Sequence, residues 1–135
     1  MGFDYLYDLF GKFRKKETRF SEVEKRAINL LSQYAKGSIQ KDDFGSQMEQ
    51  VGADFHELMK DENGNICFDQ DTPSWLNLFL GNKFGRWNHI RKVINQAREN
   101  SEITSSPNWK KALEMMEVHD QMLMEAVRYC LDELK

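Results

Sequence analysis

Apolar residues recur at the spacing of an α-helix along most of this chain. The clearest case is RFSEVEKRAINLLSQYAKG, residues 19–37, and the chain has only two prolines that would force a helix to end. The pattern predicts an all-α fold, a compact bundle of about five or six helices with at most one short hairpin, near residues 63–70. A chain of 135 residues is typical of one domain, so residues 1–135 are expected to share one core.

The apolar stripes place the expected helices. A first helix is expected around Leu6, Leu9, Phe10 and Phe13, which recur at i, i+3, i+4 and i+7. The others are expected over residues 21–36, about 42–60, from 73 onward, 86–100 and from 107 to the end, with residues 99–108 as a linker. In the segment 86–100 the inward residues are expected to be Trp87, Ile90, Val93, Ile94 and Ala97.

Several residues are typical of helix ends. Ser21 and Glu24 form a capping-box pattern, and Gly37 suits the left-handed position after a helix. Asp42 and Thr72 are expected to cap the helices that follow them. Gly81 and Gly85 are expected to break or bend the segment between 73 and 86.

Composition excludes several classes of protein. No apolar run approaches the ~20 residues of a membrane span, and the acids Asp4 and Asp8 are atypical of a signal peptide. The two cysteines, Cys67 and Cys130, have neither disulfide-framework nor metal-ligand spacing. We therefore expect a cytoplasmic protein with reduced thiols, no metal and no cofactor.

No catalytic or metal-binding motif stands out. DENGNICFDQD, residues 61–71, has a calcium-loop start, but Ile66 replaces the glycine that the sharp turn needs, so an ordinary turn is favoured. His119 beside Asp120 is typical of a surface helix histidine, and an enzyme built on it or on a cysteine is the third hypothesis. The expectation is that this protein is not an enzyme.

Charge is distributed in blocks. Residues 37–74 contain two basic and nine acidic residues, a balance of −7, whereas residues 75–111 contain seven basic and two acidic residues, a balance of +5. Such blocks can steer a charged partner or can simply be solvated helix faces. The candidate partner-binding residues lie on the acidic face: Asp42, Asp43, Glu49, Asp54, Glu57, Asp61 and Glu62.

A second candidate surface spans residues 83–98. It combines the aromatic residues Phe84 and Trp87 with five basic residues, as nucleic-acid surfaces do. The basic residues are Lys83, Arg86, Arg91, Lys92 and Arg98. The alternative is an amphipathic helix with a basic outer face, and the helical spacing places Trp87 in the core.

The stretch INLLSQYAKGSIQKDDFGSQM, residues 28–48, resembles a pattern of colicin-D-type bacterial immunity proteins. In that pattern a helix ends at a glycine-like break, an isoleucine follows, and an acidic or polar residue precedes a phenylalanine at the next helix start. The matching positions are Leu30, Leu31, Tyr34, Gly37, Ile39, Asp43 and Phe44. The second half of the chain lies outside the resemblance.

The resemblance implies a helical protein that binds a cognate toxin, typically a tRNA-cutting nuclease, and covers its active site with acidic side chains. The leading hypothesis is therefore a non-enzymatic immunity protein that neutralises a basic toxin through the acidic face. The alternative is a small helical protein that associates with nucleic acid through residues 83–98.

Overall fold

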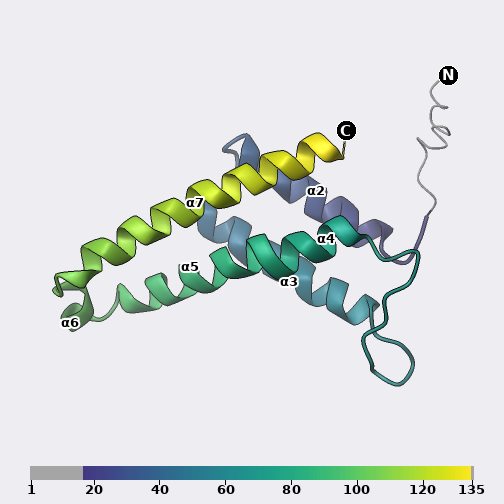
Figure 1. Ribbon diagram of the computed structural model, residues 1–135, viewed down its shortest axis with the longest axis horizontal. Helices are drawn as coiled ribbons and strands as arrows, with labels where there is room; N and C mark the ends of the chain where they lie inside the picture. The colour runs from purple at the N-terminus through teal and green to yellow at the C-terminus, as the bar shows by residue number, and fades with distance from the viewer. Residues whose placement is uncertain (1–16, 135) are drawn as a thin grey trace.

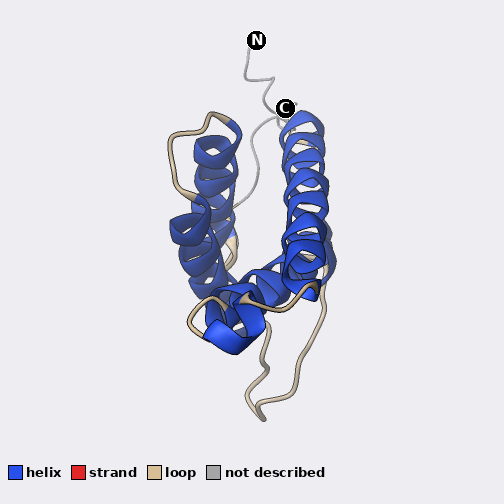
Figure 2. Cartoon of the chain, turned by 90° about the vertical axis from the view of Figure 1, so that its left-hand side faces the viewer, coloured by secondary structure: helices blue, strands red, loops and turns tan. Residues whose placement is uncertain are grey.

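The computed structural model describes residues 17–134, so the helix expected around Leu6 to Phe13 lies outside the described residues. Five helices pack together: α2 (Ser21–Ala35), α3 (Lys41–Leu58), α4 (Ser74–Leu78), α5 (Gly85–Ala97) and α7 (Asn108–Glu133). A π-helical segment, η1 (Phe79–Phe84), joins α4 to α5, and the short α6 (Ser101–Thr104) precedes α7 (Figure 1). The predicted all-α class is confirmed, because residues 17–134 contain no strand (Figure 2).

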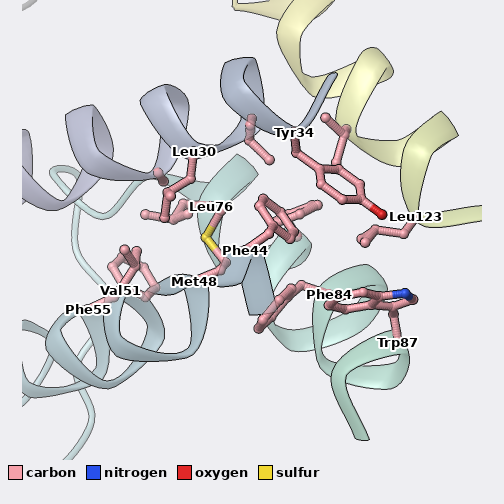
Figure 3. Close-up of a cluster of buried hydrophobic side chains, with 14 of the residues drawn as sticks. Leu30, Tyr34, Phe44, Met48, Val51, Phe55, Leu76, Phe84, Trp87 and Leu123 are labelled. Atoms are coloured by element: carbon pink, nitrogen blue, oxygen red, sulfur yellow. The ribbon is translucent and has the colours of Figure 1, made fainter. Parts of the chain in front are cut away.

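One cluster of buried side chains joins these helices (Figure 3). Tyr34 of α2 stacks on Phe44 of α3 with ring centroids 4.3 Å apart, and Trp87 of α5 meets Phe44 at 6.0 Å. Leu76 of α4 and Leu123 of α7 belong to the same buried cluster, and each is 1% exposed or less. Burying a side chain of this size stabilises the fold by roughly 1.5–3 kcal/mol, so the cluster dominates the packing energy.

The segment η1 explains why two aromatic residues five positions apart are both buried. At 3.6 residues per turn, an α-helix would place Phe79 and Phe84 on different faces. The i→i+5 bonding of a π-helix brings such residues over one another, and the two rings stack with centroids 6.1 Å apart. Helix is therefore continuous from α4 through α5, and the break expected at Gly81 and Gly85 does not occur.

Three predicted caps are wrong. No side-chain cap bond is present at the start of α2, because the Ser21 hydroxyl accepts from the Thr18 amide. The helix α3 begins one residue early, so Asp42 lies in its first turn. The Thr72 hydroxyl bonds to Asp69 and not to the start of α4.

Two smaller expectations for the second half also change. The expected linker contains α6, whose amide groups Glu102 N and Ile103 N donate to the Asn100 side chain. Val93 was expected inward, but it is 49% exposed because the register of α5 turns Arg91 and Ile94 inward in its place. None of the described helices is both long and apolar enough to cross a membrane.

The corner after α2 fits the expectation for Gly37. Its φ angle is +74°, the Ser38 amide donates to the Gln33 carbonyl, and the Gly37 amide donates to the Tyr34 carbonyl. These two bonds form a Schellman motif, which ends the helix and satisfies its last carbonyl groups.

We expect Gly37→Ala to lower the free energy of unfolding by about 1 kcal/mol, because an L side chain is strained at a positive φ. Gly81→Ala is the control, since a methyl group there meets no atom within 4 Å and needs no positive φ. Urea denaturation of both variants measures the change in the free energy of unfolding. Equal changes in the two variants would show that a side chain at position 37 causes no backbone strain.

Candidate functional site

The seven predicted acidic residues lie on α3 and the loop that follows it, but most already bond within the chain. Asp42 pairs with Arg91 at 2.9 Å, and Glu49 pairs with Lys92 at 2.7 Å. Asp54 pairs with Arg26 at 2.7 Å, and Glu57 pairs with Lys60 at 2.7 Å. Much of the acidic block is therefore neutralised by basic groups of the same chain.

Arg91 is the most deeply buried of these cations, with 7% of its side chain exposed. Its Nε and Nη2 donate to the Asn88 Oδ1 at 3.0 and 2.8 Å, and its Nη1 donates to the Asp42 Oδ1 at 2.9 Å. Its guanidinium also lies 5.6 Å from the Trp87 ring centroid. A buried charge is tolerated only when it is bonded in this way, so these contacts are required by the burial itself.

Gly45 makes room for the guanidinium on the surface of α3. A Cβ atom at this position would lie 2.5 Å from Arg91 Nε and 2.6 Å from Cζ. A glycine inside a helix lowers its intrinsic stability by about 1 kcal/mol relative to alanine. Its place in α3 is explained by the close approach of Arg91. We call Arg91, Asn88, Asp42 and Gly45 the Arg91 clamp.

The carboxylate of Asp42 is held as an anion by its neighbours. The Asn95 Nδ2 donates to Asp42 Oδ1 at 3.0 Å, alongside the Arg91 bond. These two hydrogen bonds, with that of Asn95 the larger effect, lower the pKa of Asp42 below its ordinary value of 3.8. Asp42 therefore joins α3 to α5, whatever else it binds.

Asp120 of α7 forms a second polar junction. It accepts from Trp87 Nε1 at 2.7 Å and from Lys41 Nζ at 3.0 Å, so it ties α7 to α5 and α3. Burial, followed by the Asp120 charge, raises the pKa of Tyr34. The ring of His119 bonds to the Met115 carbonyl at 3.0 Å, so Asp120 does not orient it.

The loop over residues 60–71, which we call the acidic loop, projects from the helices (Figures 1 and 2). Lys60 and Ile66 form an isolated antiparallel bridge. The Asp61 Oδ1 accepts from the Asn63 and Asn65 amides at 2.9 Å each, and Gly64 adopts a φ of +82°. The loop therefore has a defined turn closed by a single bridge, which is within the expectation of at most one short hairpin.

The acidic loop presents large apolar side chains to solvent. Phe68 is 62% exposed and Ile66 is 42% exposed. Arg19 anchors the base of the loop, because it bonds to the Asp69 carboxylate at 3.0 Å and to the Leu58 carbonyl at 2.9 Å. Four acids flank the two apolar residues in sequence on this loop: Asp61, Glu62, Asp69 and Asp71. Sequence reasoning missed Phe68, although an aromatic residue in a polar turn with no helical partner is itself a signal.

The predicted acidic face is not one surface. Asp43 and Glu62 form no ion pair or side-chain hydrogen bond among residues 17–134. They lie at opposite ends of α3, whose 18 residues span about 27 Å at 1.5 Å per residue. Asp61 and Glu62 belong to the acidic loop, whereas Asp43 stands beside the Arg91 clamp.

The basic surface at residues 83–98 lacks exposed aromatic groups. Phe84 is 4% exposed and Trp87 is 1% exposed, so neither ring is available to stack on a base. Arg91 is buried in the clamp, and Lys92 pairs with Glu49. Binding of nucleic acid by this surface stays a prediction, and it would depend on the remaining cations.

The described residues offer little for holding a metal ion or for nucleophilic chemistry. Across residues 17–134, no three His, Cys, Asp or Glu side chains gather in a way that could hold a metal ion. The Asp61 oxygen that would start a calcium loop accepts two backbone amides. Cys67 is exposed, and burial raises the pKa of the half-buried Cys130 thiol.

Comparison of the chain with protein-family models, curated proteins and solved structures found no match in any of the three.

We expect Gly45→Ala to lower the free energy of unfolding by about 1–3 kcal/mol. The new methyl group displaces a buried guanidinium from hydrogen bonds worth roughly 1.5–3 kcal/mol each, which outweighs a helix-propensity gain of about 1 kcal/mol. Gly52→Ala is the matched control in the same helix, because its nearest neighbour is Leu80 Cδ2 at an ordinary 3.8 Å.

Chemical denaturation of the two variants separates the effects. Gly52→Ala should raise stability by up to about 1 kcal/mol. A similar rise in Gly45→Ala would mean that the guanidinium moves aside without cost, and the Arg91 clamp would then not stabilise the fold.

The lowered pKa of Asp42 predicts a pH dependence. The stability from its ionised form is fully present above the ordinary value of 3.8 and is lost as the pH falls through the lowered value. Asp42→Asn keeps an oxygen acceptor but removes the charge. The stability gap between wild type and this variant should therefore be largest near pH 6 and should shrink at about pH 3.

Urea titrations at the two pH values measure this gap. Asp43→Asn is the control, because it removes a neighbouring carboxylate that has no ion pair among the described residues. A gap for Asp42→Asn that does not change with pH would contradict the role of its charge.

Proposed function

We propose that this chain is a non-enzymatic, cytoplasmic immunity protein that neutralises a basic protein toxin, expected to be a nuclease, and that the acidic loop is its main contact. The observation that carries the proposal is the exposure of Phe68, at 62%, among four acidic residues on a projecting loop. Solvent-exposed aromatic side chains of this size are frequent anchors in protein interfaces.

The acids of the loop suit a basic partner. Among residues 17–134, no cation pairs with Asp61, Glu62 or Asp71, whereas Asp69 pairs with Arg19. Acids around an apolar anchor attract a basic surface over a distance and speed the encounter. The anchor then supplies the contact area that slows dissociation.

Preorganisation favours the loop as a binding element. The Asp61 hydrogen bonds, the bridge between Lys60 and Ile66, and the bond from the Cys67 amide to the Met59 carbonyl at 2.8 Å fix its backbone. A loop that is already ordered loses less conformational entropy on binding than a disordered one.

The residues that carry the resemblance to immunity proteins contribute mostly to packing. Leu30, Leu31, Tyr34 and Phe44 are buried, and Gly37 forms the helix corner. Within that stretch, Asp42 and Asp43 are both exposed, but Asp42 pairs with Arg91, so Asp43 is the acidic residue available to a partner. The resemblance therefore supports a shared helical corner, while the proposed contact lies at the other end of α3.

The test uses a toxin-domain protein encoded beside the gene for this chain. We expect Phe68→Ala to weaken its binding about 30-fold, which corresponds to about 2 kcal/mol for a central anchor. Glu62→Lys should mainly slow association and reduce its dependence on salt. Charge reversal at Asp42 or Asp54 is avoided, because both residues bond within the fold.

Binding kinetics and inhibition of the toxin's nuclease activity are the readouts. Val93→Ala is the matched control, since Val93 is a 49% exposed apolar residue on α5, outside the loop. Unchanged affinity for both loop variants, with folding intact, would contradict the proposed contact. Inhibition that persists below one chain per toxin would contradict a stoichiometric binding protein.

A further inference from the structure

An apolar groove of about 760 Å³ lies between α4, η1 and the C-terminal half of α7. Its apolar lining includes Trp75, Leu78, Phe79, Met122, Tyr129 and Leu134. Leu78 and Tyr129 are each 66% exposed, and Met122 is 41% exposed. An exposed apolar surface of this kind usually marks a place where another element binds.

The described chain begins at one end of this groove. Trp75, a groove residue, donates through Nε1 to the Glu24 carboxylate in the first turn of α2 at 2.8 Å. Figure 1 shows the start of α2, the start of α4 and the end of α7 at the same end of the molecule. The segment 1–16 therefore joins the described residues close to the groove.

The sequence of that segment matches the groove in length and polarity. Leu6, Leu9, Phe10 and Phe13 form one apolar stripe at helical spacing. A helix over residues 3–13 would be about 16 Å long, and the stretch of α7 from Met122 to Glu133 covers about 17 Å, at 1.5 Å per residue.

The charged residues indicate in which direction the segment would run along the groove. A chain that enters near Ser74 and runs back toward η1 would place its basic residues, Lys12 and 14–16, at the end of the groove that holds Glu133. Its acidic residues, Asp4 and Asp8, would then approach the end that holds Lys83. Opposite charges would face one another at Glu133 and at Lys83, while Glu125 adds a second acid to the groove between Met122 and Tyr129.

We propose that residues 1–16 bind as an amphipathic helix in the groove between α4, η1 and α7 of the same chain. This inference does not depend on the proposed function, because the acidic loop is separate from the groove.

Cys130 lines the groove and reports whether it is covered, while Cys67 on the acidic loop is an exposed internal control. The experiment compares the full chain with a chain that lacks residues 1–16, using N-ethylmaleimide and peptide mass spectrometry. We expect the deletion to raise the alkylation rate of Cys130 at least tenfold and to leave the rate of Cys67 unchanged. A synthetic peptide of residues 1–16, added to the shortened chain, should restore the protection of Cys130.

A second variant avoids dependence on the deletion. Phe10→Asp keeps the chain length but places a charge on the apolar stripe, so it should also expose Cys130, with helicity and thermal unfolding of the described fold retained. Equal Cys130 rates in the full chain, the deletion and the variant would overturn the proposal. Protection that increases with protein concentration would overturn it as well, since it would show that the segment binds a second copy.

Discussion

The buried guanidinium of Arg91 is the interaction on which the packing of α3 against α5 depends. A charge with 7% exposure must be matched, and here Asn88, Asp42 and the Trp87 ring surround it while Gly45 gives it space. The position of each of these residues is constrained by its contact with the Arg91 guanidinium. Phe44, which stacks on Tyr34 and meets Trp87 edge-on, follows Asp42 of this clamp on α3, so the polar and apolar contacts position the same two helices.

The Arg91 clamp also shows that the acidic and basic blocks of the sequence pair with one another within the chain. Residues 37–74 are acidic and residues 75–111 are basic, which suggested attraction between this chain and a partner. In the structure, Asp42 with Arg91 and Glu49 with Lys92 join the two blocks to one another. Charge composition alone cannot distinguish the two cases, because the partner of a charge is set by tertiary packing. The acids of the acidic loop that pair with no cation among residues 17–134, namely Asp61, Glu62 and Asp71, carry the stronger case for binding.

The sequence predicted the parts of the fold that depend on periodicity. The stripes of α2, α3, α5 and α7 predicted helices whose main core residues, such as Phe44 and Trp87, are buried. The Gly37 corner was predictable as well, since few residues other than glycine tolerate its φ angle. Features set by distant contacts were not predictable, because the burial of Arg91 and the exposure of Phe68 each depend on what another segment places nearby. The candidate site therefore shifted from a whole helix face to one loop.

The π-helical segment η1 has a consequence for how this chain can vary in length. A π-helical turn holds one residue more than an α-helical turn, and here it brings Phe79 and Phe84 together. Gly81 lies within it and has no neighbour within 4 Å of a Cβ position. Loss of that residue would leave the two aromatic rings four positions apart, the spacing at which an ordinary α-helix places them on one face. The segment is thus a point at which deletion of a single residue preserves the inward faces of both α4 and α5.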